Sequence, residues 1–135
     1  METITNSQIV EDVEFLNSLT SKTRDVVKLY AMHKTFTEIA QVIGMSSVNE
    51  VIETIWSAFT AVDLMNHFST VDQYSVTGAL TTKGLDIMTS FVTINSIETL
   101  STMYNVSPYV MSIFTEFVRT ISLQNMMNSV RKETV

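Results

Sequence analysis

Apolar residues recur every three or four positions along most of this chain, which is the spacing of one face of an α-helix. One uninterrupted stripe of this kind follows Val48 and consists of Val51, Ile52, Ile55, Trp56, Phe59 and Val62. This spacing predicts a helix that begins after Ser47, runs as far as Asn66, and is buried along one face. Residues 67–79 are polar and have no sustained period, so they are predicted to form a connector.

Capping residues predict where the shorter helices begin and end. Thr35 and Glu38 have the spacing of a capping box, in which a hydroxyl and a carboxylate accept hydrogen bonds from free backbone N–H groups. Gly44 stands where such a helix needs a residue that tolerates positive φ. Ser47 and Glu50 repeat the capping-box spacing, so a second helix must begin almost at once after a sharp turn. The pattern indicates a helix-turn-helix.

Two further helices are expected ahead of this motif. Thr20 can cap a helix whose apolar residues are Val26, Val27, Leu29 and Tyr30. Asn6 or Ser7 can cap an N-terminal helix whose buried side consists of Ile9, Val10, Val13 and Leu16. We expect this first helix to pack on the core, and the alternative is a docking helix for a partner.

The second half of the chain repeats the order of features in the first half. Leu80-Thr81-Thr82-Lys83 matches Leu19-Thr20-Ser21-Lys22, and Asn105-Val106-Ser107 matches Gly44-Met45-Ser46 at the same offset. A second apolar stripe then follows at Val110, Ile113, Phe114, Phe117, Val118 and Ile121. We interpret this as an internal duplication of one helical unit, with chance similarity between two helical hairpins as the alternative.

These patterns predict an all-α protein of two pseudo-repeated helix-turn-helix units packed as one compact helical domain. The expected divisions are an N-terminal helix at 1–18, a first unit at 19–66, a connector at 67–79, and a second unit at 80–135 that ends in a long helix. Ser107-Pro108 is expected to start that helix, with the hydroxyl as cap and proline in the first turn.

Composition narrows the class of protein. Of the 135 residues, 45% are hydrophobic and only 16% are charged, so some apolar surface is expected to meet a partner. The chain has no cysteine, no apolar run of the roughly 20 residues that a membrane span needs, and no signal-peptide pattern at its start. We therefore expect a soluble cytoplasmic protein. The formal net charge of −6 disfavours non-specific attraction to nucleic acid.

The opening Leu19-Thr20, the Thr-x-x-Glu-Ile-Ala run at 35–40 and the Gly44-Met45-Ser46 turn resemble the helix-turn-helix of LuxR-type regulators and of sigma factor region 4. The resemblance covers roughly the first half of the chain and implies DNA binding. The chain departs from this pattern in the helix that would read bases, because residues 46–56 offer Asn49 set among Glu50 and Glu53.

The second candidate recognition helix, at 107–117, also lacks a cation. Tyr109 and Met111 fall off its apolar stripe, so we expect them to face solvent and to contact a protein partner, together with Asn49, Glu50 and Glu53. The cations of the first unit could form a phosphate-contacting face, although a solvated helix face is the commoner explanation; they are Lys22, Arg24, Lys28 and Lys34.

Catalytic and metal chemistry is not expected. Asp63 and His67 are one helical turn apart, but no third ligand lies nearby in the sequence. No serine has a nucleophile-elbow sequence around it, and no glycine-rich phosphate loop is present. The nine methionines fit either adaptable core filling or a pliable binding surface.

We therefore expect a non-enzymatic regulatory protein without a cofactor. The resemblance favours a transcription modulator, of a phage-like type, that binds RNA polymerase, a sigma factor or another regulator. One alternative is a DNA-binding helix-turn-helix regulator that acts as a dimer. A further alternative is a helical structural or assembly protein.

Overall fold

The computed structural model describes residues 11–66 and 80–133, with side chains described as far as Ser122. The first half contains α1 (Val13–Asn17), α2 (Ser21–Ala31), α3 (Phe36–Ile43) and α4 (Val48–Ala61). The second half contains α6 (Thr82–Ile94), α7 (Ile97–Tyr104) and α8 (Pro108–Glu133). The predicted all-α class is confirmed, and regular structure in the described residues is helical apart from one isolated bridge between Met65 and Leu80.

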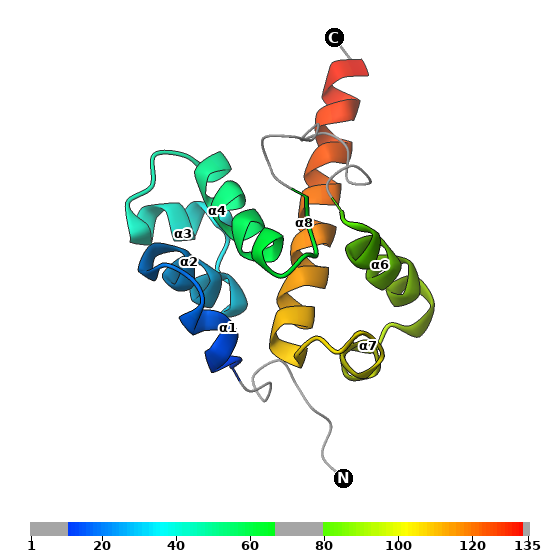
Figure 1. Cartoon of the computed structure of the whole chain (residues 1–135). Helices are drawn as coiled ribbons and strands as arrows, with labels where there is room; N and C mark the ends of the chain where they lie inside the picture. Colours follow the sequence, from blue (N-terminus) through cyan, green and yellow to red (C-terminus); the bar gives the residue numbers. More distant parts are fainter. Residues whose placement is uncertain (1–10, 67–79, 134–135) are drawn as a thin grey trace.

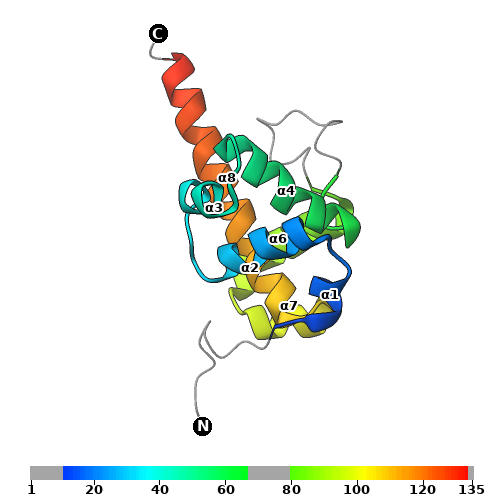
Figure 2. The ribbon, with the colours of Figure 1, turned by 90° about the vertical axis from the view of Figure 1, so that its left-hand side faces the viewer.

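Helix α8 stands between the two groups of helices. Figure 1 shows α1 to α4 on one side of α8 and α6 with α7 on the other. Helix α2 packs on both α3 and α4, whereas α6 packs on α7 and α7 packs on α8. The view turned by 90° in Figure 2 shows that the C-terminal part of α8 projects beyond the other helices.

The capping residues lie where the sequence predicts them. The side chains of Thr20, Thr35 and Ser47 each accept a hydrogen bond from a backbone N–H in the first turn of the helix that follows. Ser96 and Ser107 do the same for α7 and α8. The predicted starts of these helices are therefore confirmed.

The left-handed helix ends are also confirmed. Gly44 ends α3 with φ 84°, and Asn105 ends α7 with φ 53°. Thr35 and Glu38 form the full capping box, but Glu50 does not complete a second one with Ser47. Its carboxylate instead accepts hydrogen bonds from the backbone N–H and the hydroxyl of Ser46, so the predicted second box is wrong.

The predicted extent of the first helix is wrong. Helix α1 begins only after Asp12, whose Oδ1 accepts a hydrogen bond from the Phe15 backbone N–H at 3.0 Å. The expected caps, Asn6 and Ser7, lie outside the described residues. Phe15 and Leu16 are buried, while the side chain of Val13 is 62% exposed. A carboxylate that bonds to the backbone ahead of the apolar run therefore set the helix start, which the apolar spacing alone did not reveal.

The predicted end of α4 is wrong as well. The helix ends at Ala61, and Asp63 takes a left-handed conformation with φ 61°. The backbone N–H of Leu64 donates to the Phe59 carbonyl oxygen at 3.0 Å, and the side chains of Leu64 and Met65 are fully buried. The chain leaves the helix there because these two apolar residues turn back into the core.

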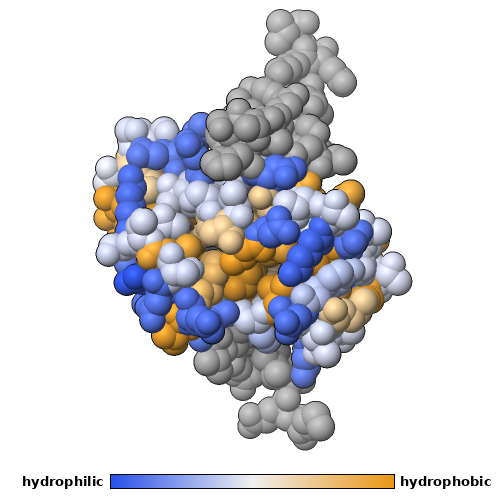
Figure 3. Space-filling model, in the orientation of Figure 1, coloured by the Kyte–Doolittle hydropathy of each residue, from blue (hydrophilic) through white to orange (hydrophobic). Residues whose placement is uncertain are grey.

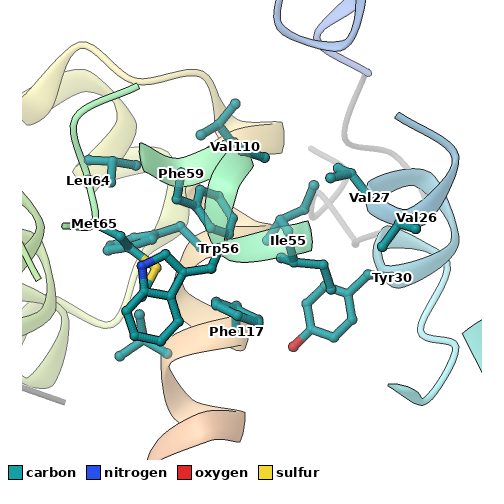
Figure 4. Close-up of a cluster of buried hydrophobic side chains, with 14 of the residues drawn as sticks. Val26, Val27, Tyr30, Ile55, Trp56, Phe59, Leu64, Met65, Val110 and Phe117 are labelled. Carbon is teal, nitrogen blue, oxygen red and sulfur yellow. The ribbon is translucent and has the colours of Figure 1, made fainter. Parts of the chain in front are cut away.

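Phe117 of α8 lies at the centre of the packing between α8 and the first half. Its ring centroid lies 6.0 Å from that of Tyr30, 6.2 Å from that of Phe36 and 5.8 Å from that of Phe59. Figure 4 shows side chains of α2, α4 and α8 meeting in this one cluster. Helices α2, α3 and α4 are thus all held against the same residue of α8, so the first helix-turn-helix is not an independent body.

The two halves also contact each other where the segment that follows α4 meets the start of α6. The Thr81 backbone N–H donates to the Leu64 carbonyl oxygen at 3.3 Å, and the Thr81 hydroxyl donates to the Asp63 carbonyl oxygen at 2.7 Å. A Cβ atom on Gly84 would lie 2.1 Å from the Leu64 carbonyl oxygen and 3.3 Å from Cζ of Phe114. Only glycine allows α6 to approach the Leu64 backbone this closely.

We predict that Gly84→Ala lowers the free energy of unfolding by about 3 kcal/mol or more, because the new methyl group meets backbone that must shift. Gly44→Ala is the matched control. It has no atom within 4 Å of the added Cβ, so it should cost only about 1 kcal/mol for the left-handed φ. Urea denaturation of both variants measures this, and equal losses would contradict the close contact at Gly84.

We also predict that Trp56→Ala and Phe117→Ala each lower the free energy of unfolding by about 3–5 kcal/mol. Trp56 is 2% exposed and Phe117 is fully buried, so both truncations leave a large cavity. Chemical denaturation checks the loss for each variant. A loss below about 1 kcal/mol would mean that the site refills by collapse of its neighbours.

Candidate protein-binding surface

The first two turns of α4 present a polar, acidic face. Asn49 and Glu53 are exposed and stand one helical turn apart, so they point to the same side. The sequence of α4 contains no lysine, arginine or histidine. This face, which we call the α4 acidic face, consists of Asn49, Glu50 and Glu53.

Glu50 is held in place by groups of the chain itself. Its Oε2 accepts hydrogen bonds from the Ser46 hydroxyl at 2.9 Å and the Ser46 backbone N–H at 3.1 Å. Its Oε1 lies 3.3 Å from Nζ of Lys22. The hydrogen bonds from Ser46, followed by the Lys22 ammonium, hold the pKa of the Glu50 carboxyl below its usual range. Glu50 is therefore ionised and fixed, whereas Glu53 is the exposed carboxylate of the face.

The four cations expected as possible phosphate contacts do not form one free basic face. Lys22 on α2 pairs with Glu50 on α4. Arg24 donates from Nε to the Leu16 carbonyl oxygen at 3.0 Å and from Nη2 to the Leu19 carbonyl oxygen at 3.2 Å. Its guanidinium thus satisfies carbonyl groups at and after the end of α1, which is a structural role. Two of the four cations are already engaged within the chain.

Lys28 and Lys34 are exposed, on α2 and on the turn that follows it. In that turn His33 takes a left-handed φ of 67°, and its Nδ1 lies 3.6 Å from Oε1 of Glu116 on α8. A carboxylate therefore stands beside this remaining basic region. The structure does not place either lysine on the α4 acidic face.

The expectation that Tyr109 and Met111 face solvent is wrong. Tyr109 is 6% exposed and Met111 is fully buried. Val110, between them, is buried too, and three successive helical positions span about 200° around the axis. Helix α8 is therefore surrounded at its start, and these residues cannot serve as surface anchors in this fold. The sequence pattern suggested one buried face because it does not reveal that a helix has neighbours on two sides.

Two buried hydroxyl groups have no hydrogen-bond partner among the described residues, those of Ser101 and Tyr109. Burial, and after it the nearby Glu11 carboxylate, raise the pKa of Tyr109 to about 12. The phenol is thus neutral at physiological pH. A buried hydroxyl without a hydrogen-bond partner weakens the packing around it.

Sequence reasoning missed the apolar side chains that remain on the surface. The most exposed of these is Val92 on α6, at 85%, followed by Val42 on α3 at 67%. Each has apolar neighbours in the sequence but lies beside the stripe of positions spaced by three and four residues on its helix. No neighbouring helix in the described part of the chain covers these two side chains, so they remain apolar surface.

The described part of the chain holds no group of three or more histidine, aspartate or glutamate side chains placed to bind a metal ion. Asp63 lies in the left-handed turn after α4, and His67 falls outside the described residues. Across residues 11–66 and 80–133, no helix has both the length and the apolar character that spanning a bilayer requires.

Comparison of this chain with models of known protein families, with curated protein sequences and with solved structures finds no match.

We predict that Tyr109→Phe leaves the free energy of unfolding within about 0.5 kcal/mol of the parent or raises it, because it removes a buried hydroxyl that has no hydrogen-bond partner among the described residues. Tyr30→Phe is the matched control. The Tyr30 hydroxyl lies 3.1 Å from the Thr120 hydroxyl, and its loss should cost about 1 kcal/mol. Denaturant titration compares the two variants, and a larger loss at Tyr109 would show that its hydroxyl has a stabilising partner.

Proposed function

We propose that this protein is a non-enzymatic regulator that acts by binding another protein through the α4 acidic face. The observation that carries the proposal is that Glu53 and Asn49 are exposed on a helix whose sequence contains no cation. A surface of this kind complements a cationic protein surface, and the complementarity both orients the partner and speeds association.

Charge also weighs against DNA as the ligand of this face. A helix that enters the major groove brings its first turns close to phosphates, where Glu50 and Glu53 would be repelled. Lys22, which lies beside this face, is already paired with Glu50. The first turns of α8 are buried by neighbouring helices, so the second unit offers no recognition helix for DNA either.

The more specific proposal is that the partner belongs to the transcription machinery, being RNA polymerase, a sigma factor or another regulator. It is supported by the resemblance in the first half of the chain and by the capped α3, the left-handed Gly44 and the capped α4 that follow one another there. A regulator that lost base-reading residues but kept this turn would present α4 to protein instead of DNA. No observation favours the structural or assembly alternative over this one.

We predict that Glu53→Lys weakens binding to the partner by about tenfold or more, because it places a cation where the partner's cationic surface docks. Glu98→Lys is the matched control, since Glu98 is also an exposed helical carboxylate but lies on α7. Calorimetric titration against purified RNA polymerase and sigma factor from the source cell measures both affinities. Equal affinities for the two variants would place the interface elsewhere.

The same preparation should show no sequence-specific DNA binding at physiological salt in a mobility-shift assay. Nanomolar binding that depends on the DNA sequence would contradict the proposal and favour the DNA-binding alternative.

A further inference from the structure

A cleft of about 430 Å³ opens where the two halves of the chain meet. Its walls come from α1, from the chain that leaves α4, from the first turn of α6 and from the turn between α7 and α8. In Figure 1 the end of α4, the start of α8 and α1 converge in the lower middle of the molecule. The volume is in the range of sites that enclose a small molecule or a large side chain.

The floor of the cleft is apolar. Phe15, Leu64 and Val110 are buried, and Val62 and Val106 are half-buried. Hydrophobic surface is visible near the middle of the face drawn in Figure 3, bordered by hydrophilic residues. An apolar group that entered this space would remove its own surface and that of the half-buried valines from water, which is favourable.

The rim of the cleft is charged, with a net negative sign. Asp12 and Glu14 stand on the α1 wall, and Lys83 stands on the α6 wall. Oδ1 of Asp12 already accepts the Phe15 backbone N–H, whereas the Glu14 side chain is exposed. Among the described residues, no ion pair joins Lys83 to either carboxylate. Two carboxylates and one ammonium group therefore favour a ligand that carries a positive charge on the α1 side.

We propose that this cleft binds a bulky apolar side chain from a basic segment of the protein partner, with the cationic group of that segment beside Asp12 and Glu14. This inference rests on the proposed protein-binding function and adds a second contact site with a stated chemistry. Charge complementarity selects the occupant. A second copy of this chain would bring a net charge of −6 to an acidic rim, and an anionic ligand would meet the same repulsion.

The test uses two small compounds of the same shape and opposite charge, phenethylammonium and phenylacetate. Each is titrated into the full-length ¹⁵N-labelled protein while amide chemical shifts are recorded. The expected result is that phenethylammonium shifts amides of the cleft, such as those of Ser18, Val62 and Val106, and binds about threefold or more tightly than phenylacetate.

Glu14→Gln should weaken phenethylammonium binding by about threefold, since it removes an exposed carboxylate of the rim. Glu53→Gln is the matched control, because it removes an exposed carboxylate that does not line the cleft, and it should leave this binding unchanged. Shifts outside the cleft, no shifts, or equal or tighter binding of phenylacetate would overturn the inference.

The two sites can be separated once the partner is in hand. Glu14→Lys tests the cleft and Glu53→Lys tests the α4 acidic face, each in the same calorimetric titration. If only Glu53→Lys weakens partner binding, the cleft inference fails and the proposed function stands. If only Glu14→Lys does so, the cleft inference stands and the α4 acidic face is not the interface.

Discussion

The close approach of α6 to the Leu64 carbonyl group is the contact on which the arrangement of the two halves depends. This carbonyl group leaves no room for a side chain at Gly84, and its oxygen accepts a hydrogen bond from the Thr81 backbone N–H. The buried Leu64 and Met65 draw the chain away from the axis of α4, and the Asp63 turn makes this possible with a left-handed residue. Helix α6 is thereby fixed on the far side of α8, and α8 becomes the helix that both halves share.

Because both halves pack on α8, the corresponding helices of the two halves do not expose equivalent surfaces. The two halves have the same order of helices, and α3 and α7 have eight residues each with similar caps. Yet α4 keeps an exposed polar face, while α8 buries Tyr109, Val110 and Met111 in succession. The helix that takes the place of α4 in the second half therefore forms the core of the molecule instead of an exposed surface. The two binding surfaces that we propose are therefore α4 and the cleft where the halves meet.

The distribution of charge gives these two surfaces the same sign. Arg24 bonds to carbonyl groups at and after the end of α1, and Lys22 pairs with Glu50, so both cations are engaged within the chain. Glu53 on α4 and Glu14 beside the cleft stay exposed. Salt bridges at an exposed surface add little stability. For the proposed function, the greater effect of this pattern is on the choice of partner, which we expect to be cationic where it meets either site.

The sequence by itself determined the local structure. Hydroxyl caps at Thr20, Thr35 and Ser107 and left-handed ends at Gly44 and Asn105 are short-range effects, because the groups that bond are only a few residues apart. The tertiary structure decided which apolar residues are covered: it buried Met111, which the stripe left outside, and exposed Val13, which the apolar spacing assigned to a buried side. Burial depends on neighbours distant in the chain, and the periodicity of one helix reports that it has a buried face without reporting how many helices pack against it.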